Sequence, residues 1–145
     1  MRGAPLDALQ RVWLFGDLNK RELSQIARLF KLRKFPAGET VIKEGSGGGA
    51  FYVIESGEAT VFVRGESRAK LGPGDHFGEI SLIDEGARTA TITALSELVC
   101  YGMTLWEFRP LVQQNGVVGW KLLQTLAKLF RDAQEARPAG LSAGV

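Results

Sequence analysis

The sequence has little of the chemistry that many enzymes use, with one cysteine and one histidine among 145 residues. A single cysteine cannot form a disulfide within the chain, which indicates a reducing compartment. Cys100 lies in the apolar run from Leu98 to Tyr101, so we expect a buried small hydrophobic residue there. His76 alone cannot build a multi-histidine metal site, and no Ser-His-Asp or Cys-His arrangement is available. We therefore expect neither an enzyme nor a bound metal.

Long apolar runs and a strong excess of one charge are also missing. No stretch of 18 residues is continuously apolar, and the segment from Met1 to Asp7 lacks the apolar region of a secretory signal. The net charge is only +2, and the lysines and arginines do not gather in one block. Nothing here argues for a nucleic-acid or membrane partner. These absences predict a cytoplasmic protein without membrane insertion.

The composition that remains is that of one globular domain. Apolar residues make up 45% of the chain and charged residues 23%, which is the balance of an ordinary folded protein. We expect a domain over residues 1–137, with N-terminal helices in 1–32, a β region in 33–104 and C-terminal helices in 105–137. Residues 138–145 are mostly small, and we expect a flexible tail there.

Two helices are predicted at the N-terminus. Apolar residues at helical spacing predict the first from Leu6 to Phe15. Asn19, followed three residues later by Glu22, fits a capping box, in which each side chain bonds a backbone amide that the first turn leaves unpaired. The second helix is therefore expected to begin after Asn19 and to run to about Leu32.

The β region shows short alternating or β-branched segments separated by glycine-containing turns. Connections this brief require antiparallel pairing, because a parallel pair needs a long crossover. Short strands at this spacing favour a closed roll. The fold class we predict is mainly β with flanking α-helices, an antiparallel β-roll or jelly roll. The expected strands are Thr40 to Lys43, Ala50 to Glu55, Ala59 to Arg64, Thr89 to Ala94 and Leu98 to Met103.

Two further helices are predicted after the β region, from Leu105 to Gln114 and from Val117 to about Ala136. The last helix has two apolar lines on its surface. The first line includes Leu122, Leu126 and Leu129, and the second consists of Leu123, Ala127 and Phe130. Each apolar face needs a partner surface to bury it. We therefore expect one face to pack against the roll and the other to pack against a second copy of the helix.

The stretch from Phe77 to Ala90 does not alternate like a strand. Gly78 precedes a segment, Glu79 to Leu82, that can form one helical turn with amides directed at an anion. Arg88 follows at the start of a strand, where its guanidinium can give two parallel N–H bonds to the same group. From these residues alone, Glu79 and Arg88 are either an exposed ion pair or part of an anion site.

This stretch resembles the phosphate-binding cassette of the cyclic-nucleotide-binding domain family. That cassette reads F-G-E-[IL]-[AGS]-L, a short loop and [AP]-R-[SAT]-A, and Phe77 to Leu82 with Ala87 to Ala90 fit every position. The family includes bacterial catabolite activators, regulatory subunits of cyclic-AMP-dependent kinase and cyclic-nucleotide-gated channels. The resemblance extends to the flanking helices and to the family's turn glycines, which match Gly38, Gly45, Gly57 and Gly74.

The resemblance implies a role for each cassette residue. Arg88 would bind the cyclic phosphate, and Glu79 would accept a hydrogen bond from the ribose 2′-hydroxyl and pair partly with Arg88. Gly78 would allow close approach of the ligand. Main-chain amides would bind further phosphate oxygens, and those expected are at Ile80, Ser81 and Thr89.

The expected ligand is cyclic AMP first and cyclic GMP second, bound without a metal. Thr89 follows the arginine, as a threonine does in some cyclic-GMP-responsive relatives. Where the catabolite activators carry a Thr-Ser pair that meets adenine, this chain has Ala133 and Gln134, so Gln134 is the residue expected to reach the base. The signal would be a movement of the last helix toward the ligand.

Three alternatives stay open. The domain is a nucleotide-independent dimerisation or interaction module of the same fold, whose last helix pairs with a second copy through Leu122, Leu126 and Leu129, or which acts on an unidentified effector chain. It is a truncated DNA-binding regulator, in which case a helix-turn-helix and nucleic-acid binding would follow past Val145. An enzyme of the cupin type, which shares the jelly roll, is the third, and metal analysis would test it.

Overall fold

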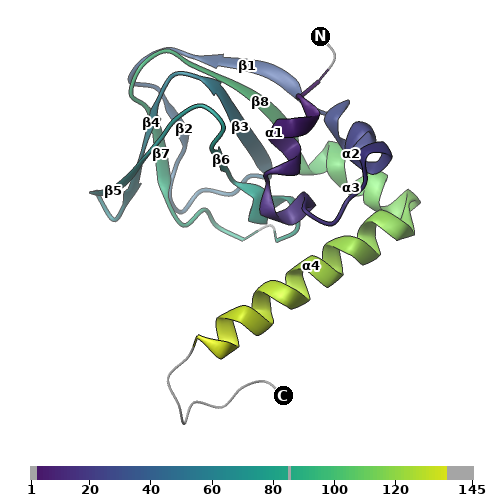
Figure 1. The fold of residues 1–145 in the computed structure, drawn as a ribbon. Helices are drawn as coiled ribbons and strands as arrows, with labels where there is room; N and C mark the ends of the chain where they lie inside the picture. The colour runs from purple at the N-terminus through teal and green to yellow at the C-terminus, as the bar shows by residue number, and fades with distance from the viewer. Residues whose placement is uncertain (1–2, 85, 137–145) are drawn as a thin grey trace.

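A computed structural model describes residues 3–84 and 86–136. Three short helical elements come first, then a β-roll interrupted by one 3-10 turn, then two α-helices (Figure 1). The N-terminal elements are α1 (Leu6–Gln10), the 3-10 helix η1 (Trp13–Phe15) and α2 (Lys20–Ala27). The predicted Leu6–Phe15 helix is therefore two pieces, and the second helix ends five residues before Leu32.

The capping box predicted for the second helix is confirmed. The side-chain oxygen Oδ1 of Asn19 accepts from the Glu22 amide at 2.9 Å, and Glu22 Oε1 accepts from the Asn19 amide at 2.8 Å. This helix ends at Ala27, whose carbonyl oxygen accepts from the amides of Ala4 and Phe30. The chain then turns directly into the first strand.

The roll is two four-stranded antiparallel sheets. One has the order β1-β8-β3-β6 and the other β2-β7-β4-β5. Their bounds are Lys31–Phe35 for β1, Thr40–Ile42 for β2, Ala50–Ser56 for β3, Ala59–Val63 for β4, Glu66–Leu71 for β5, His76–Phe77 for β6, Thr91–Ala94 for β7 and Leu98–Thr104 for β8. The predicted fold class is confirmed, although the predicted strands omit β1, β5 and β6.

Two apolar cores organise the molecule. The first lies between the facing sheets and contains Cys100, whose predicted burial is confirmed. The second joins the helices to the outer face of β3 and β8 through residues such as Phe15, Phe51 and Met103. Between β6 and β7 the chain forms the 3-10 helix η2 (Glu79–Leu82), and Leu82 belongs to this second core. The turn that carries the cassette is thus anchored to the helices.

The C-terminal helices are α3 (Leu105–Gln114) and α4 (Gly116–Glu135), close to the predicted ranges. Side-chain caps from Thr104 and Asn115 start them. Figure 1 shows α1, α2 and α3 gathered at one end of the roll, while the last turns of α4 lie apart from the strands. Among residues 3–84 and 86–136, no helix is long and apolar enough to cross a membrane. The predicted tail, 138–145, lies outside the described residues.

Candidate functional site

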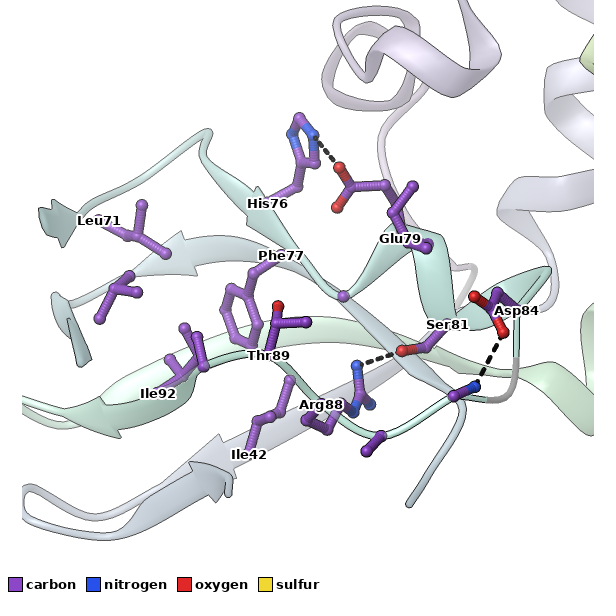
Figure 2. A pocket seen from close by; sticks show the side chains of 16 residues that line it. Ile42, Leu71, His76, Phe77, Glu79, Ser81, Asp84, Arg88, Thr89 and Ile92 are labelled. Carbon is purple, nitrogen blue, oxygen red and sulfur yellow. Dashed lines mark hydrogen bonds and ion pairs between the residues drawn. The ribbon is translucent and has the colours of Figure 1, made fainter. Parts of the chain in front are cut away.

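A pocket of about 410 Å³ opens between the two sheets beside η2. Its apolar end is lined by Ile42, Leu71 and Ile92, and Ser81 and Arg88 line the other end (Figure 2). The pocket therefore has an apolar end and a cationic end. It suits a ligand with a flat apolar part and an anionic part.

Arg88 is the cation of this pocket and is only 9% exposed. Its Nη1 donates to Ser81 Oγ at 2.8 Å, and its Nη2 donates to the Ala50 carbonyl oxygen at 2.9 Å. Its backbone is also fixed, because the Arg88 amide donates to Ser46 O at 2.9 Å and its carbonyl accepts from Gly45 N at 2.8 Å. Backbone and side chain together hold the guanidinium at the pocket wall.

The partners of Arg88 leave its charge uncompensated. Among the described residues, no carboxylate forms an ion pair with it. Burial lowers the pKa of Arg88 below its ordinary value, because desolvation disfavours the charged form. A guanidinium carries more N–H donors than these two bonds use, and none of the fully buried side-chain polar atoms in 3–84 and 86–136 lacks a partner. Arg88 lines the pocket, and an anion bound there would accept from donors that these two bonds leave unused.

Gly78 lies where the cassette packs closely against β3 and Arg88. It has φ of +89°, and a Cβ there would lie 2.6 Å from Ala50 O and 3.0 Å from Arg88 Nη1. A side chain at this position would therefore collide with both the strand and the guanidinium. Glycine at this position thus has a steric basis within the fold, while the predicted close approach of a ligand at Gly78 stays a prediction.

Glu79 lines the pocket but does not pair with Arg88, so the expected partial ion pair between them is absent from the described residues. Its Oε2 instead accepts a 2.7 Å hydrogen bond from Trp13 Nε1. His76 Nε2 lies 3.7 Å from the same oxygen, and Figure 2 shows the carboxylate turned toward this ring. The reason is local, because η2 directs residue 79 toward β6 while it directs Ser81 toward Arg88.

The other predicted residues divide between the pocket and the surface. Ile80 and Thr89 line the pocket and are largely exposed. The Ser81 amide donates to Gly78 O at 3.1 Å, and the Ser81 hydroxyl accepts from Arg88. The expected contacts from the amides of Ile80, Ser81 and Thr89 to phosphate oxygens stay predictions. Gln134 lies on α4 and is not among the pocket-lining residues.

Two contributors were not anticipated from the sequence. The Ala50 carbonyl and the Trp13 indole come from segments 38 and 66 residues away from the cassette residues that they bond. No spacing rule connects such distant positions, so only the fold reveals them. In the described ranges, no group of three or more His, Cys, Asp or Glu residues could hold a metal ion.

The β-roll, the buried arginine and the glycine-opened turn define a binding module for a small anionic ligand. The sequence model of the cyclic nucleotide-binding domain family matches residues 32–115, which is more than half of the chain. This chain belongs to the cyclic nucleotide-binding domain family.

Several known proteins are similar to it. The cAMP-dependent protein kinase regulatory subunit of Emericella nidulans is 44% identical over 92 residues, which are 62% of this chain and 22% of that protein. The cyclic AMP receptor protein of Thermus thermophilus is 31% identical over 138 residues, 92% of this chain and 60% of that protein. The N-terminal domain of a transcriptional regulator from Streptomyces coelicolor superposes with a TM-score of 0.83 at 29% identity, covering 92% and 99% of the two chains. The chain thus spans only part of the length of both curated relatives.

Proposed function

We propose that this domain binds cyclic AMP, with cyclic GMP as the second candidate, and acts as a regulatory module rather than an enzyme. The observation that carries the proposal is Arg88, a buried cation with spare donors and no carboxylate partner among the described residues. Leaving such a charge unpaired is costly, and a cyclic phosphate would offset that cost. Glu79 lines the same pocket and would accept a hydrogen bond from the ribose, and the apolar end of the pocket suits a base.

Adenine is the preferred base because both curated relatives described above carry cyclic AMP in their names. The exposed hydroxyl of Thr89 at the pocket wall keeps guanine as the second choice. In this proposal Gln134 reaches the base only when α4 moves, since it lies outside the pocket.

The proposed signal is a repositioning of α4. Leu82 of η2 packs in the same core as Phe108 of α3 and Leu122 of α4. A shift of the cassette would therefore change the packing of both helices. Polar contacts to the N-terminal segment hold α4 in place. These are Lys121 to Glu22 at 2.8 Å, Thr125 to Asp17 at 2.9 Å and Lys128 to Asp17 at 3.1 Å. A ligand moves α4 only if it binds the two positions with different affinity.

A second candidate function, homodimerisation through α4, is favoured by an exposed apolar face. Trp120, Leu123 and Phe130 are 63%, 58% and 55% exposed. Exposed apolar surface of this kind is typical of an interaction site. Leu122 and Leu126 were expected to pair with the second copy, and that is wrong, because Leu122 is buried in its own core and Leu126 packs against it.

Side-by-side calorimetric titrations with cyclic AMP and cyclic GMP test the proposal. We expect binding of both with tighter binding of cyclic AMP. Tighter binding of cyclic GMP would overturn the choice of base. A chain that binds neither nucleotide and whose sedimentation shows a concentration-dependent dimer would replace the sensor by the dimerisation module.

A further inference from the structure

The carboxylate of Glu79 is held from outside the cassette. Trp13 Nε1 donates to Glu79 Oε2 at 2.7 Å across 66 residues of sequence, and the two groups are partly buried. His76 Nε2, 3.7 Å from the same oxygen, approaches it from β6 (Figure 2). A bond of this length from an N–H to a carboxylate is a strong, orienting contact.

Trp13 is itself fixed in place. It belongs to η1, whose next two residues, Leu14 and Phe15, are fully buried. Phe15 packs edge-on against Phe51 of β3 with ring centroids 6.0 Å apart, and the Trp13 ring packs against the same core. The indole N–H is therefore a donor whose position is set by the core rather than by the cassette.

This arrangement divides the two oxygens of Glu79. Both contacts fall on Oε2, while within 3–84 and 86–136 no donor is bonded to Oε1. The Glu79 side chain is 18% exposed, and the residue lines the same pocket as Arg88. A carboxylate anchored at one oxygen presents the other in a defined direction, which reduces the conformational entropy lost when a ligand hydroxyl binds it.

We propose that Trp13 is a positioning residue for ribose recognition: its indole N–H holds Oε2 of Glu79 so that Oε1 is presented to the 2′-hydroxyl of the ligand. This inference rests on the proposed function, because it needs a cyclic nucleotide in the pocket. It adds a residue of the N-terminal segment to the determinants of ligand specificity.

The test is the ratio of affinities for cyclic AMP and its 2′-deoxy analogue, measured by calorimetry on the full chain. Trp13→Phe keeps an aromatic ring in the core and removes the N–H. We expect the ratio to fall by about fivefold or more, the size expected for weakening a hydrogen bond to a charged group. In a Glu79→Ala background, Trp13→Phe should change the ratio no further. Trp106→Phe, at an exposed tryptophan outside the pocket, is the matched control and should leave the ratio unchanged.

A purely structural role for Trp13 gives a different result. In that case Trp13→Phe lowers the free energy of unfolding but leaves the affinity ratio as in the wild type, and the proposal is wrong. If Trp13→Phe does not fold, a benzothiophene ring incorporated at position 13 replaces the N–H by sulfur at nearly constant size, and the same ratio decides. A wild-type chain that binds neither nucleotide would instead refute the proposed function itself, since the ratio then has no meaning.

Discussion

Arg88 Nη1 donates a 2.8 Å hydrogen bond to Ser81 Oγ, which connects the two ends of the cassette. Because both groups are buried, removing the hydroxyl leaves the guanidinium with one partner fewer and with less fixed geometry. Ser81→Ala should therefore weaken cyclic AMP binding by about 1–2 kcal/mol, or about five- to thirtyfold. Calorimetry measures the change.

The control for this substitution is Ser67→Ala, at an exposed serine on β5. It should leave the affinity unchanged. If Ser81→Ala bound cyclic AMP as tightly as Ser67→Ala does, the Ser81 hydroxyl would have no part in orienting Arg88.

Gly78 and Gly38 allow steric collision to be separated from backbone strain. Both have φ of +89°, but a Cβ at residue 38 would meet no atom within 4 Å, whereas one at residue 78 would meet Ala50 O and Arg88 Nη1. Gly38→Ala should cost about 1–2 kcal/mol in the free energy of unfolding, the cost of a left-handed conformation. Gly78→Ala should cost more and should also weaken ligand binding. Equal stability losses and unchanged affinity in the two variants would rule out the collision.

The contacts that hold α4 predict a loss of stability at low pH. Hydrogen bonds from Lys128 and Thr125 lower the pKa of Asp17 below its ordinary 3.8, and a hydrogen bond from Lys121 lowers the pKa of Glu22 below its ordinary 4.5. A carboxyl group whose pKa is lower in the folded state stabilises the fold above its ordinary pKa. That contribution is lost as the pH falls through the lowered values. Urea unfolding between pH 7 and pH 3 should show this decline.

Lys121→Met removes one of these contacts and leaves the capping box of Glu22 intact. The decline in unfolding free energy below about pH 4.5 should become shallower than in the wild type. Lys70→Met, at an exposed lysine of β5, is the control and should keep the wild-type slope. An identical slope in both variants would mean that the Lys121 to Glu22 contact does not couple α4 stability to pH.

The Cys100 thiol should not react with thiol reagents in the folded protein. Burial raises the pKa of its thiol to about 12, so hardly any reactive thiolate forms at pH 8. Modification by a thiol reagent should proceed only as fast as the protein opens, and denaturant should accelerate it. Rapid labelling of the folded chain would show that the core around β8 is open to solvent.

The start of α2, the helices α3 and α4 and the central strands were predictable because their signals are local. The capping box of α2 and the apolar periodicity of α3 and α4 lie within a few residues. Strand β1 was missed because Lys31, Arg33 and Lys34 hide any apolar alternation, and its pairing with β8 is a long-range property. Strand β6 has two residues, too few for a periodic signal.

The site was predictable only in part, for the same physical reason. The resemblance to the family's contiguous cassette assigned Gly78, Ser81 and Arg88 to one pocket, and the structure brings them together. The bond from Trp13 to Glu79 depends on how η1 docks on the roll. Likewise, which line of α4 is covered depends on the N-terminal segment, since both lines are apolar.

The most direct test of the account is a calorimetric titration of wild-type, Arg88→Ala and Arg68→Ala chains with cyclic AMP. Arg88→Ala removes the buried partner of the phosphate and should cost roughly 2–5 kcal/mol, weakening binding by at least about thirtyfold. Arg68→Ala removes an exposed arginine, paired at the surface with Glu66, and should bind like the wild type. If Arg88→Ala binds cyclic AMP as tightly as Arg68→Ala, the buried guanidinium is not the phosphate receptor and the account is contradicted.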